Sequence, residues 1–168
     1  MKGLTKVLVG SAAAILLAGI LPSPMVSAGG DNACYKFSRA ERAFRNKTNA
    51  ARQDNGLGSL HLDPELSRAA KVHTKEMIAD NTLYHTTDAQ FRRRVTNWNV
   101  IGENVGVGGG VSSLHSAFMN SPDHRSNILY STFRHVGIGV IKKDGQMWVS
   151  VQFEAQNNPG TTLSMPSC

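Results

Sequence analysis

Several features that would assign this 168-residue chain to a familiar class are scarce or missing. Charged residues make up only 18% of it, aromatic residues 7%, and the formal net charge is +6, which argues against nucleic-acid binding. The patterns Gly-x-Ser-x-Gly, His-Glu-x-x-His and Cys-x-x-Cys are absent, so nothing supports a serine-hydrolase elbow, a zincin helix or a dithiol redox site. No repeat or proline-rich linker divides the chain. Because hydrophobic residues reach 40%, we exclude disorder and predict one folded domain.

The first 28 residues have the layout of a secretory signal peptide. Lys2 and Lys6 form a basic start, residues 7–21 are apolar or small without charge, and Val26 and Ala28 stand where a signal peptidase favours small side chains. The apolar stretch of about 15 residues is shorter than the roughly 20 that span a bilayer, and no later stretch is apolar enough. We therefore predict cleavage after Ala28, no transmembrane segment and a secreted, extracellular domain over residues 29–168, with its core at about 38–155.

The chain has two cysteines, Cys34 and Cys168. In an exported protein an even pair of cysteines is most simply a disulfide, which would here tie the two ends of the mature chain together. Two free thiols are the alternative. A cysteine nucleophile has less support, because neither residue lies in a motif that lowers the pKa of a thiol.

Capping signals predict two helices in the first half of the mature chain. Ser38 and Glu41 form a capping-box pattern, so a helix begins at Ser38 and ends at Asn55-Gly56. Asp63, followed by proline, begins a second helix that ends near residue 80. The predicted apolar side of the first helix comprises Ala40, Ala43, Phe44, Ala50 and Ala51, and that of the second comprises Leu66, Ala69, Ala70, His73 and Met77.

The second half changes from helical to strand periodicity. A third helix is expected over residues 112–120, with Leu114, Ala117 and Phe118 inward, and a short helical turn over 122–129. Residues 136–141 and 147–153 alternate with period two around a turn at 143–145, which predicts a β-hairpin. Helices followed by strands indicate an α+β fold with an antiparallel sheet. Residues 106–110, rich in glycine, lack the Lys-Ser/Thr of a nucleotide site and are interpreted as a flexible loop.

Four side chains are candidates for chemistry: His73, His85, Glu103 and His124. His73 lies on the apolar side of the second helix, where a histidine is more often a hydrogen-bonded core residue than a ligand. Glu103 is an acid between apolar neighbours, and a buried acid must be paired or protonated. No serine is placed beside a histidine by the sequence. Each residue alone is a weak indication of a site.

A family resemblance is carried by several segments, among them Asn49-Ala50-Ala51-Arg52, Asp63-Pro64-Glu65-Leu66, Tyr84-His85-Thr86, Gly102-Glu103-Asn104-Val105 and Ser121-Pro122-x-His124-Arg125. They resemble the CAP superfamily, which contains the cysteine-rich secretory proteins, antigen 5 and the plant pathogenesis-related proteins. The resemblance covers about residues 38–155, and its Ser-Pro-x-His-Arg form is similar to the bacterial, secreted branch.

The resemblance implies a three-layer α-β-α sandwich with a central antiparallel sheet and an open cleft lined by histidines and acids. His85, Glu103 and His124 match the first histidine, first acid and second histidine of that cleft, and Asn104 follows Glu103. The second acid of the family corresponds to a position near Ser121, where this chain has no carboxylate. Asp123 is the candidate replacement for that charge.

Two of the three functions that stay open use the cleft. The first is a binding module: the resemblance implies a small apolar ligand such as a lipid, sterol or fatty acid, and a divalent metal, and two imidazoles with one carboxylate (His85, His124 and Glu103) suit Zn²⁺. The ordinary alternative is that these groups only brace one another. The second is a peptidase-like hydrolase with the same residues, in which Glu103 is the base or a metal-bound water attacks.

The third function is binding to an anionic cell-surface polymer through Arg92-Arg93-Arg94 and Lys142-Lys143, for which a solvated charged face is the alternative. Phe91, Trp98 and Phe133, as large apolar residues in predicted loops, are the expected contacts of a lipid, unless they cover the core. We expect a monomer that binds no nucleic acid, and a binding protein rather than an enzyme.

Overall fold

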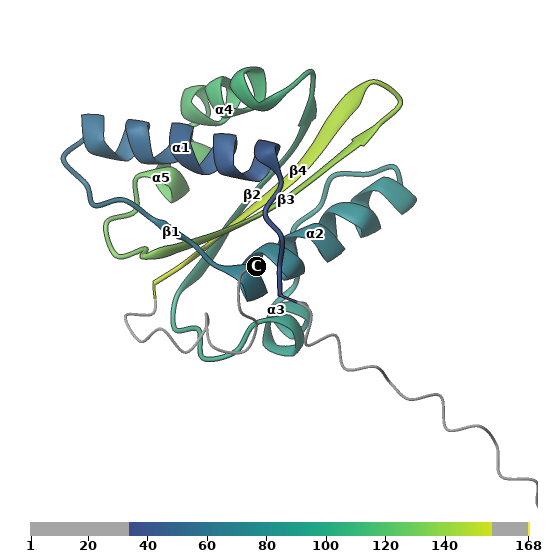
Figure 1. The fold of residues 1–168 in the computed structure, drawn as a ribbon, viewed down its shortest axis with the longest axis horizontal. Coiled ribbons are helices and arrows are strands. Elements are labelled where there is room, and N and C mark those ends of the chain that lie inside the picture. Colours follow the sequence, from purple (N-terminus) through teal and green to yellow (C-terminus); the bar gives the residue numbers. More distant parts are fainter. Residues whose placement is uncertain (1–33, 156–167) are drawn as a thin grey trace, which may run out of the picture. The chain divides into compact units, whose positions relative to one another are not determined.

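Helices α1 (Arg39–Asp54) and α2 (Pro64–Ala79) begin at the capping residues that the sequence predicts. The computed structural model describes residues 34–155 and 168 (Figure 1). The Ser38 hydroxyl accepts from the Glu41 N–H, and the Glu41 carboxylate accepts from the Ser38 N–H. The Asp63 carboxylate accepts from the Leu66 N–H in the same way. These caps satisfy amides that a first helical turn leaves unpaired. The predicted signal peptide and its cleavage site lie outside the described residues.

The buried side of α2 is the predicted one, whereas that of α1 is more polar than predicted. Ala50 is exposed, and Glu41 and Arg52 are buried instead. Asn49 is also buried, and its amide exchanges two hydrogen bonds with the main chain of Leu60. A helix can bury polar side chains when each of them is hydrogen-bonded, and a count of apolar residues does not reveal such a face.

Three shorter helices follow: α3 (Asp88–Arg94), α4 (Val111–Asn120) and α5 (Pro122–Ile128). The last two occupy the predicted positions, although Ala117 is exposed rather than inward. Helix α3 was not predicted, even though Thr87 and Gln90 form a capping box at its start. Since a strand also lies between α3 and α4, the elements do not run as helices followed by strands.

The sheet contains β1 (His61–Leu62), β2 (Ile101–Gly108), β3 (His135–Lys143) and β4 (Gln146–Glu154), in the order β1-β3-β4-β2. The predicted hairpin is confirmed as β3 and β4, which pair antiparallel and turn at Asp144 and Gly145 with φ of 51° and 76°. Such left-handed turn residues match the twist of a two-residue hairpin. Strand β2 pairs antiparallel with β4, and the short β1 pairs parallel with β3.

The glycine-rich segment interpreted as a flexible loop is largely strand. Gly106 and Gly108 belong to β2, and only Gly109 and Gly110 connect it to α4. The segment is a strand because it pairs with β4, and a Cβ atom on Gly106 would lie 3.0 Å from the Phe118 ring, so glycine there lets α4 pack closely.

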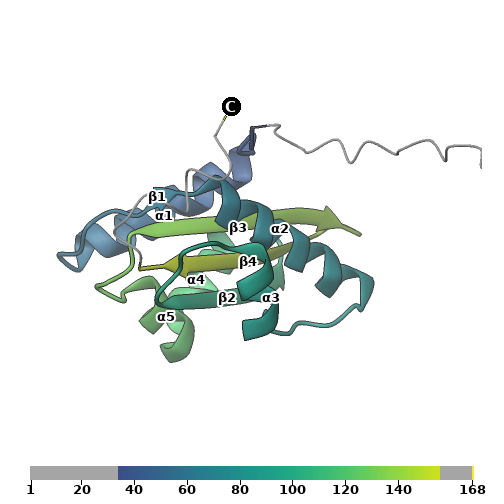
Figure 2. The same ribbon diagram turned by 90° about the horizontal axis from the view of Figure 1, so that it is seen from below.

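Helices cover both faces of the sheet, as the expected α-β-α sandwich requires (Figures 1 and 2). On one face α1, α4 and α5 contribute Phe44, Phe118 and Ile128 to the main core, where they meet alternate residues of β3 and β4. On the other face α2 and α3 form a smaller cluster that includes Leu66, Ala69, Phe91 and Val95. The fold is therefore an α+β three-layer sandwich.

Helix α2 packs against the sheet almost backbone to backbone. A Cβ atom on Gly137 would lie 2.2 Å from the main-chain carbon of Leu66, and one on Gly139 would lie 2.3 Å from the Lys71 nitrogen. No other residue fits at either position, because real Cβ contacts are never that short. The alternating glycines of β3 therefore set the distance between α2 and the sheet.

The predicted disulfide joins Cys34 to Cys168, whose Cα atoms are 4.8 Å apart. The described residues belong to one compact unit that spans Asp31–Cys168. None of the helices in residues 34–155 is long and apolar enough to cross a membrane.

Candidate functional site

Glu103 lies in β2, opposite Gln152 of β4, and its carboxylate receives five hydrogen bonds. Oε1 accepts from the Thr86 hydroxyl at 2.8 Å, the Ser150 hydroxyl at 2.8 Å and the Gln152 amide at 3.0 Å. Oε2 accepts from the Thr86 N–H at 2.8 Å and lies 3.1 Å from Nδ1 of His85. We call this set the Glu103 network. It leaves the carboxylate little capacity for a further partner.

The network keeps Glu103 ionised in a buried place. The side chain is only 3% exposed, and burial alone would raise the pKa of its carboxyl. Hydrogen bonds from His85, Gln152 and the Thr86 N–H, together with the nearby His73, outweigh burial and lower the pKa to about 2. A carboxylate held so strongly as an anion is a poor general base at neutral pH.

His85 is the exposed member of the Glu103 network. It comes from the segment between α2 and α3, and its side chain is 61% exposed. The hydrogen bond to Glu103, although opposed by partial burial, raises the pKa of the imidazole. When Nδ1 donates to the carboxylate, Nε2 presents a lone pair on the exposed ring.

His124 lies in the first turn of α5 and is half-buried. Its Nδ1 is 2.9 Å from the Ser121 hydroxyl, and its ring packs on the Phe118 ring at a centroid distance of 4.9 Å. Burial lowers the pKa of His124, and the charge of His85 lowers it further against the opposing charge of Asp123. Because the charge of His85 acts on the pKa of His124, we consider the two residues together and call them the histidine pair.

Asn104 links the strand to the helix that carries His124. Its amide donates to the His124 carbonyl at 2.9 Å, and its carbonyl accepts from the Asn127 amide at 2.9 Å. Asn127 also donates to the main-chain carbonyl of Glu103 at 3.1 Å. Neighbouring residues of β2 thus position one histidine each, Glu103 through its carboxylate and Asn104 through its amide.

The two remaining predicted residues, Asp123 and His73, differ in how they contact the site. Asp123 is exposed, and its contribution near the site is the field that it exerts on His124. His73 is fully buried as predicted, with Nε2 2.7 Å from the Tyr84 carbonyl, but it also lies 3.9 Å from Oε2 of Glu103. His73 therefore packs beneath the Glu103 network rather than away from it.

A three-ligand metal set of His85, Glu103 and His124 is not formed. Within residues 34–155 and 168, no three side chains of His, Cys, Asp or Glu are arranged to hold a metal ion. The physical reason is that both oxygens of Glu103 face hydrogen-bond donors.

Sequence reasoning missed four polar residues of the site: Thr86, Ser121, Ser150 and Gln152. Thr86 follows His85 directly, and Ser121 precedes His124 by one helical turn. Their spacing from the two histidines in the sequence could therefore have identified both residues. Ser150 and Gln152 alternate with core residues in β4, where a polar period-two pattern is ordinary. The sequence alone places no serine beside a histidine, whereas the fold brings the Ser121 hydroxyl to 2.9 Å from Nδ1 of His124.

The predicted lipid contacts are mostly core residues. Phe91 is buried in α3, not in a loop, and Phe133 is in a loop but stacks on Phe153 with ring centroids 5.4 Å apart. Trp98 is half-buried at a hollow of about 380 Å³. That hollow is lined by Arg92, Val95, Thr96, Asn97 and Trp98, and neither residue of the histidine pair borders it.

The predicted basic patch is not one surface. Arg94 pairs with Glu76, Arg92 stacks over Trp98 at 5.2 Å, and of the three arginines in α3 only Arg93 and Arg92 are exposed. Lys142 and Lys143 stand beside the hairpin turn, and Figure 1 shows that turn far from α3.

Known proteins are similar to this chain in sequence and in fold. The Bacillus subtilis protein YkwD is 30% identical over 118 residues, which cover 66% of this chain and 46% of YkwD, so the chain spans less than half of that relative. An extracellular SCP-domain protein of Bacillus anthracis is similar in structure, with a TM-score of 0.62 and 25% identity over 70% of this chain and 40% of that one. An outer surface protein of Borrelia burgdorferi has the same fold, with a TM-score of 0.64 and 19% identity over 69% and 92% of the two chains.

The sequence model of the cysteine-rich secretory protein family, CAP, matches residues 45–153. That range contains β2, β3 and all but the last residue of β4, together with every residue of the histidine pair and of the Glu103 network. The match spans well over half of the chain and coincides with a three-layer sandwich shared with bacterial SCP-domain proteins. The chain therefore belongs to the cysteine-rich secretory protein (CAP) family.

Proposed function

We propose that this domain binds a divalent metal ion through Nε2 of His85 and Nε2 of His124, with Glu103 orienting the first imidazole instead of ligating. The observation that carries this proposal is that both rings have Nδ1 engaged, by Glu103 and by Ser121. A histidine ligand usually donates its other ring nitrogen to a carboxylate or similar group, which fixes its tautomer and orientation.

The donor set suits an ion that prefers imidazole and keeps open positions. Two neutral imidazoles favour Zn²⁺ among the common divalent ions, and water would complete the coordination. Such an ion supplies Lewis acidity to a bound oxygen. With two protein ligands, the site should bind more weakly than a four-ligand structural zinc site.

Zinc titration tests the proposal. We expect His85→Ala and His124→Ala each to abolish specific Zn²⁺ binding in calorimetry, because one imidazole alone does not form a site. Glu103→Gln should retain binding that is about ten- to a hundredfold weaker, as for other residues that orient a ligand. His61→Ala, which removes an exposed histidine of β1, is the matched control and should bind as the wild type does. Equal affinity in all four variants would refute the site.

The same titration at lower pH adds a second criterion. Zinc binds the neutral imidazole, so it competes with protons. Because Glu103 raises the pKa of His85, this competition should begin above the ordinary histidine value of about 6.5. Affinity should therefore fall as the pH decreases from about 8 to about 6, and a pH-independent affinity would exclude imidazole ligands.

A hydrolase is the second candidate, and the contact between Ser121 and His124 favours it. Ser121 stands where a helix cap would accept from α5, yet its hydroxyl makes no cap hydrogen bond and instead lies 2.9 Å from Nδ1 of His124. Burial lowers the pKa of His124, which keeps the imidazole neutral and able to take a proton. This role needs the lone pair of Nδ1, whereas metal binding needs a proton there, so the two functions require opposite tautomers.

A serine-directed fluorophosphonate probe tests the hydrolase. Attack by Ser121 Oγ would form an oxygen–phosphorus bond and expel fluoride, while the hydroxyl proton passes to His124. We expect labelling of the wild type and of Ser126→Ala, a control in the same helix, and at least a tenfold slower rate in Ser121→Ala and His124→Ala. Absence of labelling in the wild type, or labelling that survives Ser121→Ala, would dismiss this candidate.

We also propose that the mature protein acts outside the cell. The signal-peptide layout of residues 1–28 supports this location, as does the similarity to proteins described as extracellular and outer-surface. Mass spectrometry of the culture medium should find a chain that begins at Gly29.

A further inference from the structure

A cluster of cations and aromatic rings forms where the described chain begins, far from the histidine pair. The rings of Tyr35 and Phe37 lie 5.1 Å apart. Nζ of Lys71 lies 5.8 Å from the Tyr35 ring centre, and the guanidinium of Arg42 lies 5.5 Å from the Phe37 ring centre. Both distances allow a cation–π interaction. We call these four residues the cation–aromatic cluster.

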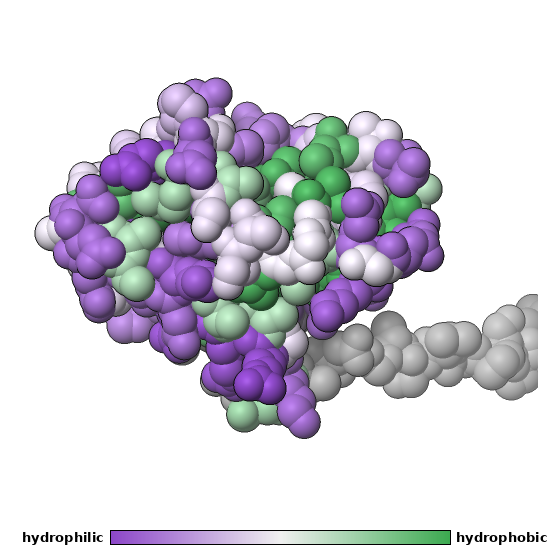
Figure 3. Space-filling model, turned by 90° about the horizontal axis from the view of Figure 1, so that it is seen from above, coloured by the Kyte–Doolittle hydropathy of each residue, from purple (hydrophilic) through white to green (hydrophobic). Residues whose placement is uncertain are grey.

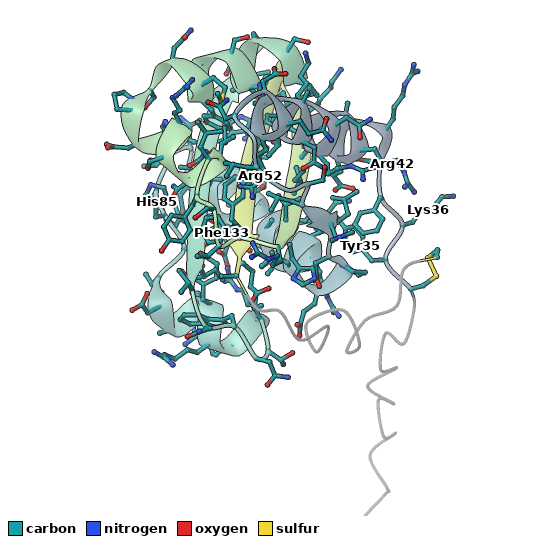
Figure 4. The ribbon with its side chains drawn as sticks, turned by 90° about the vertical axis from the view of Figure 1, so that its left-hand side faces the viewer. Tyr35, Lys36, Arg42, Arg52, His85 and Phe133 are labelled. Carbon is teal, nitrogen blue, oxygen red and sulfur yellow. A yellow bond between two sulfur atoms is a disulfide. The ribbon has the colours of Figure 1, made fainter. Side chains whose placement is uncertain are left out.

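Further positive charge lies beside the cluster, and Glu41, the acid that contacts it, is occupied. Lys36 and Arg39 are exposed in the same segment and in the first turn of α1. Glu41 is fully buried and accepts from the Tyr35 hydroxyl and the Ser38 N–H. Figure 3 shows hydrophilic residues gathered where the described chain begins, and Figure 4 shows Tyr35, Lys36 and Arg42 together, on the side of the molecule opposite His85.

The disulfide holds this surface in place. Cys34 precedes Tyr35 and is bonded to Cys168, whose N–H donates to the Tyr35 carbonyl at 3.2 Å. The Tyr35 hydroxyl is fixed on Glu41 at 2.8 Å. The aromatic rings are thus ordered before any ligand arrives, and the cations on them lose less side-chain entropy on binding than free lysines and arginines would.

We infer that the cation–aromatic cluster, with Lys36 and Arg39, binds a linear polymer whose charges are phosphodiesters, as in a polyol phosphate. An arginine stacked on a ring keeps the N–H groups at the edge of its guanidinium free, and these match two oxygens of one phosphate. A lysine ammonium adds a point charge for a second phosphate. Several cations on one surface suit a chain of repeated charges better than a single small anion.

Other surfaces and partners fit less well. A membrane would need apolar side chains that protrude beside the cations, whereas Tyr35 and Phe37 each have a cation over the ring and are only partly exposed. The arginines of α3 are partly used, since Arg94 pairs with Glu76.

Binding to poly(glycerol phosphate) of defined length tests the inference. We expect the double variant Arg42→Ala/Lys71→Ala to bind about tenfold more weakly than the wild type and with a shallower dependence on salt. Lys142→Ala/Lys143→Ala removes the same charge from the hairpin end and should change affinity less than twofold. Phe37→Leu keeps an apolar side chain but removes the ring beneath Arg42, and should weaken binding about threefold. Thermal melts of each variant confirm that it is folded.

Four results would overturn the inference. They are unchanged affinity in Arg42→Ala/Lys71→Ala, an equal loss in the hairpin control, no binding of the polymer by the wild type, and binding to phosphatidylglycerol vesicles but not to the polymer. Reduction of the Cys34–Cys168 bond provides a further check, because releasing the segment that carries both rings should also weaken binding. Zinc affinity should be the same in all of these variants, since none of them alters the histidine pair.

Discussion

Glu103→Gln is expected to lower the free energy of unfolding by about 3 kcal/mol at pH 7. Lowering of the carboxyl pKa from 4.5 to about 2 corresponds to that amount at about 1.4 kcal/mol per pKa unit. A glutamine keeps the shape but turns an NH₂ group toward hydroxyl and amide donors that need an acceptor. Urea unfolding at pH 7 measures the difference.

The lowered pKa of Glu103 also predicts the direction in which stability changes with pH. The folded pKa of Glu103 lies below the unfolded value, so its stabilisation is complete above about pH 4.5 and is lost as the pH falls from there to about 2. The wild type should therefore lose about 3 kcal/mol more than Glu103→Gln over that interval. Glu76→Gln is the control, because that partly exposed carboxylate pairs with Arg94 and should cost less than about 1 kcal/mol. Parallel pH profiles of the wild type and Glu103→Gln would contradict the role of the network.

The sequence predicts the ends of the long helices and the hairpin because local chemistry decides them. Capping by Ser38 and Asp63 acts within four residues, and the turn at Asp144 and Gly145 needs only their left-handed conformation. Helix α3 carries the same kind of local signal in Thr87 and Gln90, so its omission was a missed signal and not a limit of the sequence.

Strand β2 was beyond such local reasoning. Glycine is depleted in strands, so Gly106 and Gly108 favour the prediction of a loop as long as the position of α4 is unknown. Close contact with the side chains of Leu114 and Phe118 across the layer favours small residues there. Tertiary packing, which the chain does not encode within a short window, decides this element.

The candidate site was half predictable for a similar reason. The family resemblance selects His85, Glu103 and His124, and the structure brings the first two into direct contact. The resemblance does not tell whether Glu103 is a metal ligand or an internal hydrogen-bond acceptor, because that depends on hydroxyl and amide groups from two other segments, at Thr86 and in β4. Ser150 and Gln152 lie in a strand, where alternating polar residues are common and usually face solvent. Only the three-dimensional structure shows that this face of the sheet is buried and that both residues contact Glu103.

Replacing Arg52, like replacing Glu103, is expected to lower the free energy of unfolding strongly. Arg52 is 1% exposed, yet within residues 34–155 and 168 its guanidinium donates to main-chain carbonyls and to no carboxylate. The carbonyls are those of Gly58 and Tyr130 and, deeper, of Ile128 and Phe133, so one side chain joins α1 to the turn after it and to the segment after α5. Burial, and then the charge of Arg134, lower the pKa of Arg52. Figure 4 shows Arg52 beside Phe133.

Replacing Arg52 differs from replacing a buried ion pair. When both partners of a pair become hydrophobic, no polar group is left unpaired, and stability is often unchanged or higher. Here the partners are backbone carbonyls, which no substitution at position 52 removes. Arg52→Met should therefore lower the free energy of unfolding by about 3–5 kcal/mol, because buried acceptors lose their donors. Arg52→Lys should cost about 2 kcal/mol, since an ammonium offers three donors and lacks the planar fork that reaches all four carbonyls.

Urea unfolding of Arg52→Met and Arg52→Lys measures these losses, with Arg93→Met as the control. Arg93 is exposed in α3, so removing its charge should change stability by less than about 0.5 kcal/mol. If Arg52→Met were as stable as the wild type, the carbonyls would have to find water or rearrange, and the guanidinium would not be what joins α1 to the segment after α5. If Arg52→Lys matched the wild type while Arg52→Met did not, the positive charge, and not the geometry of the guanidinium, would account for the stabilisation.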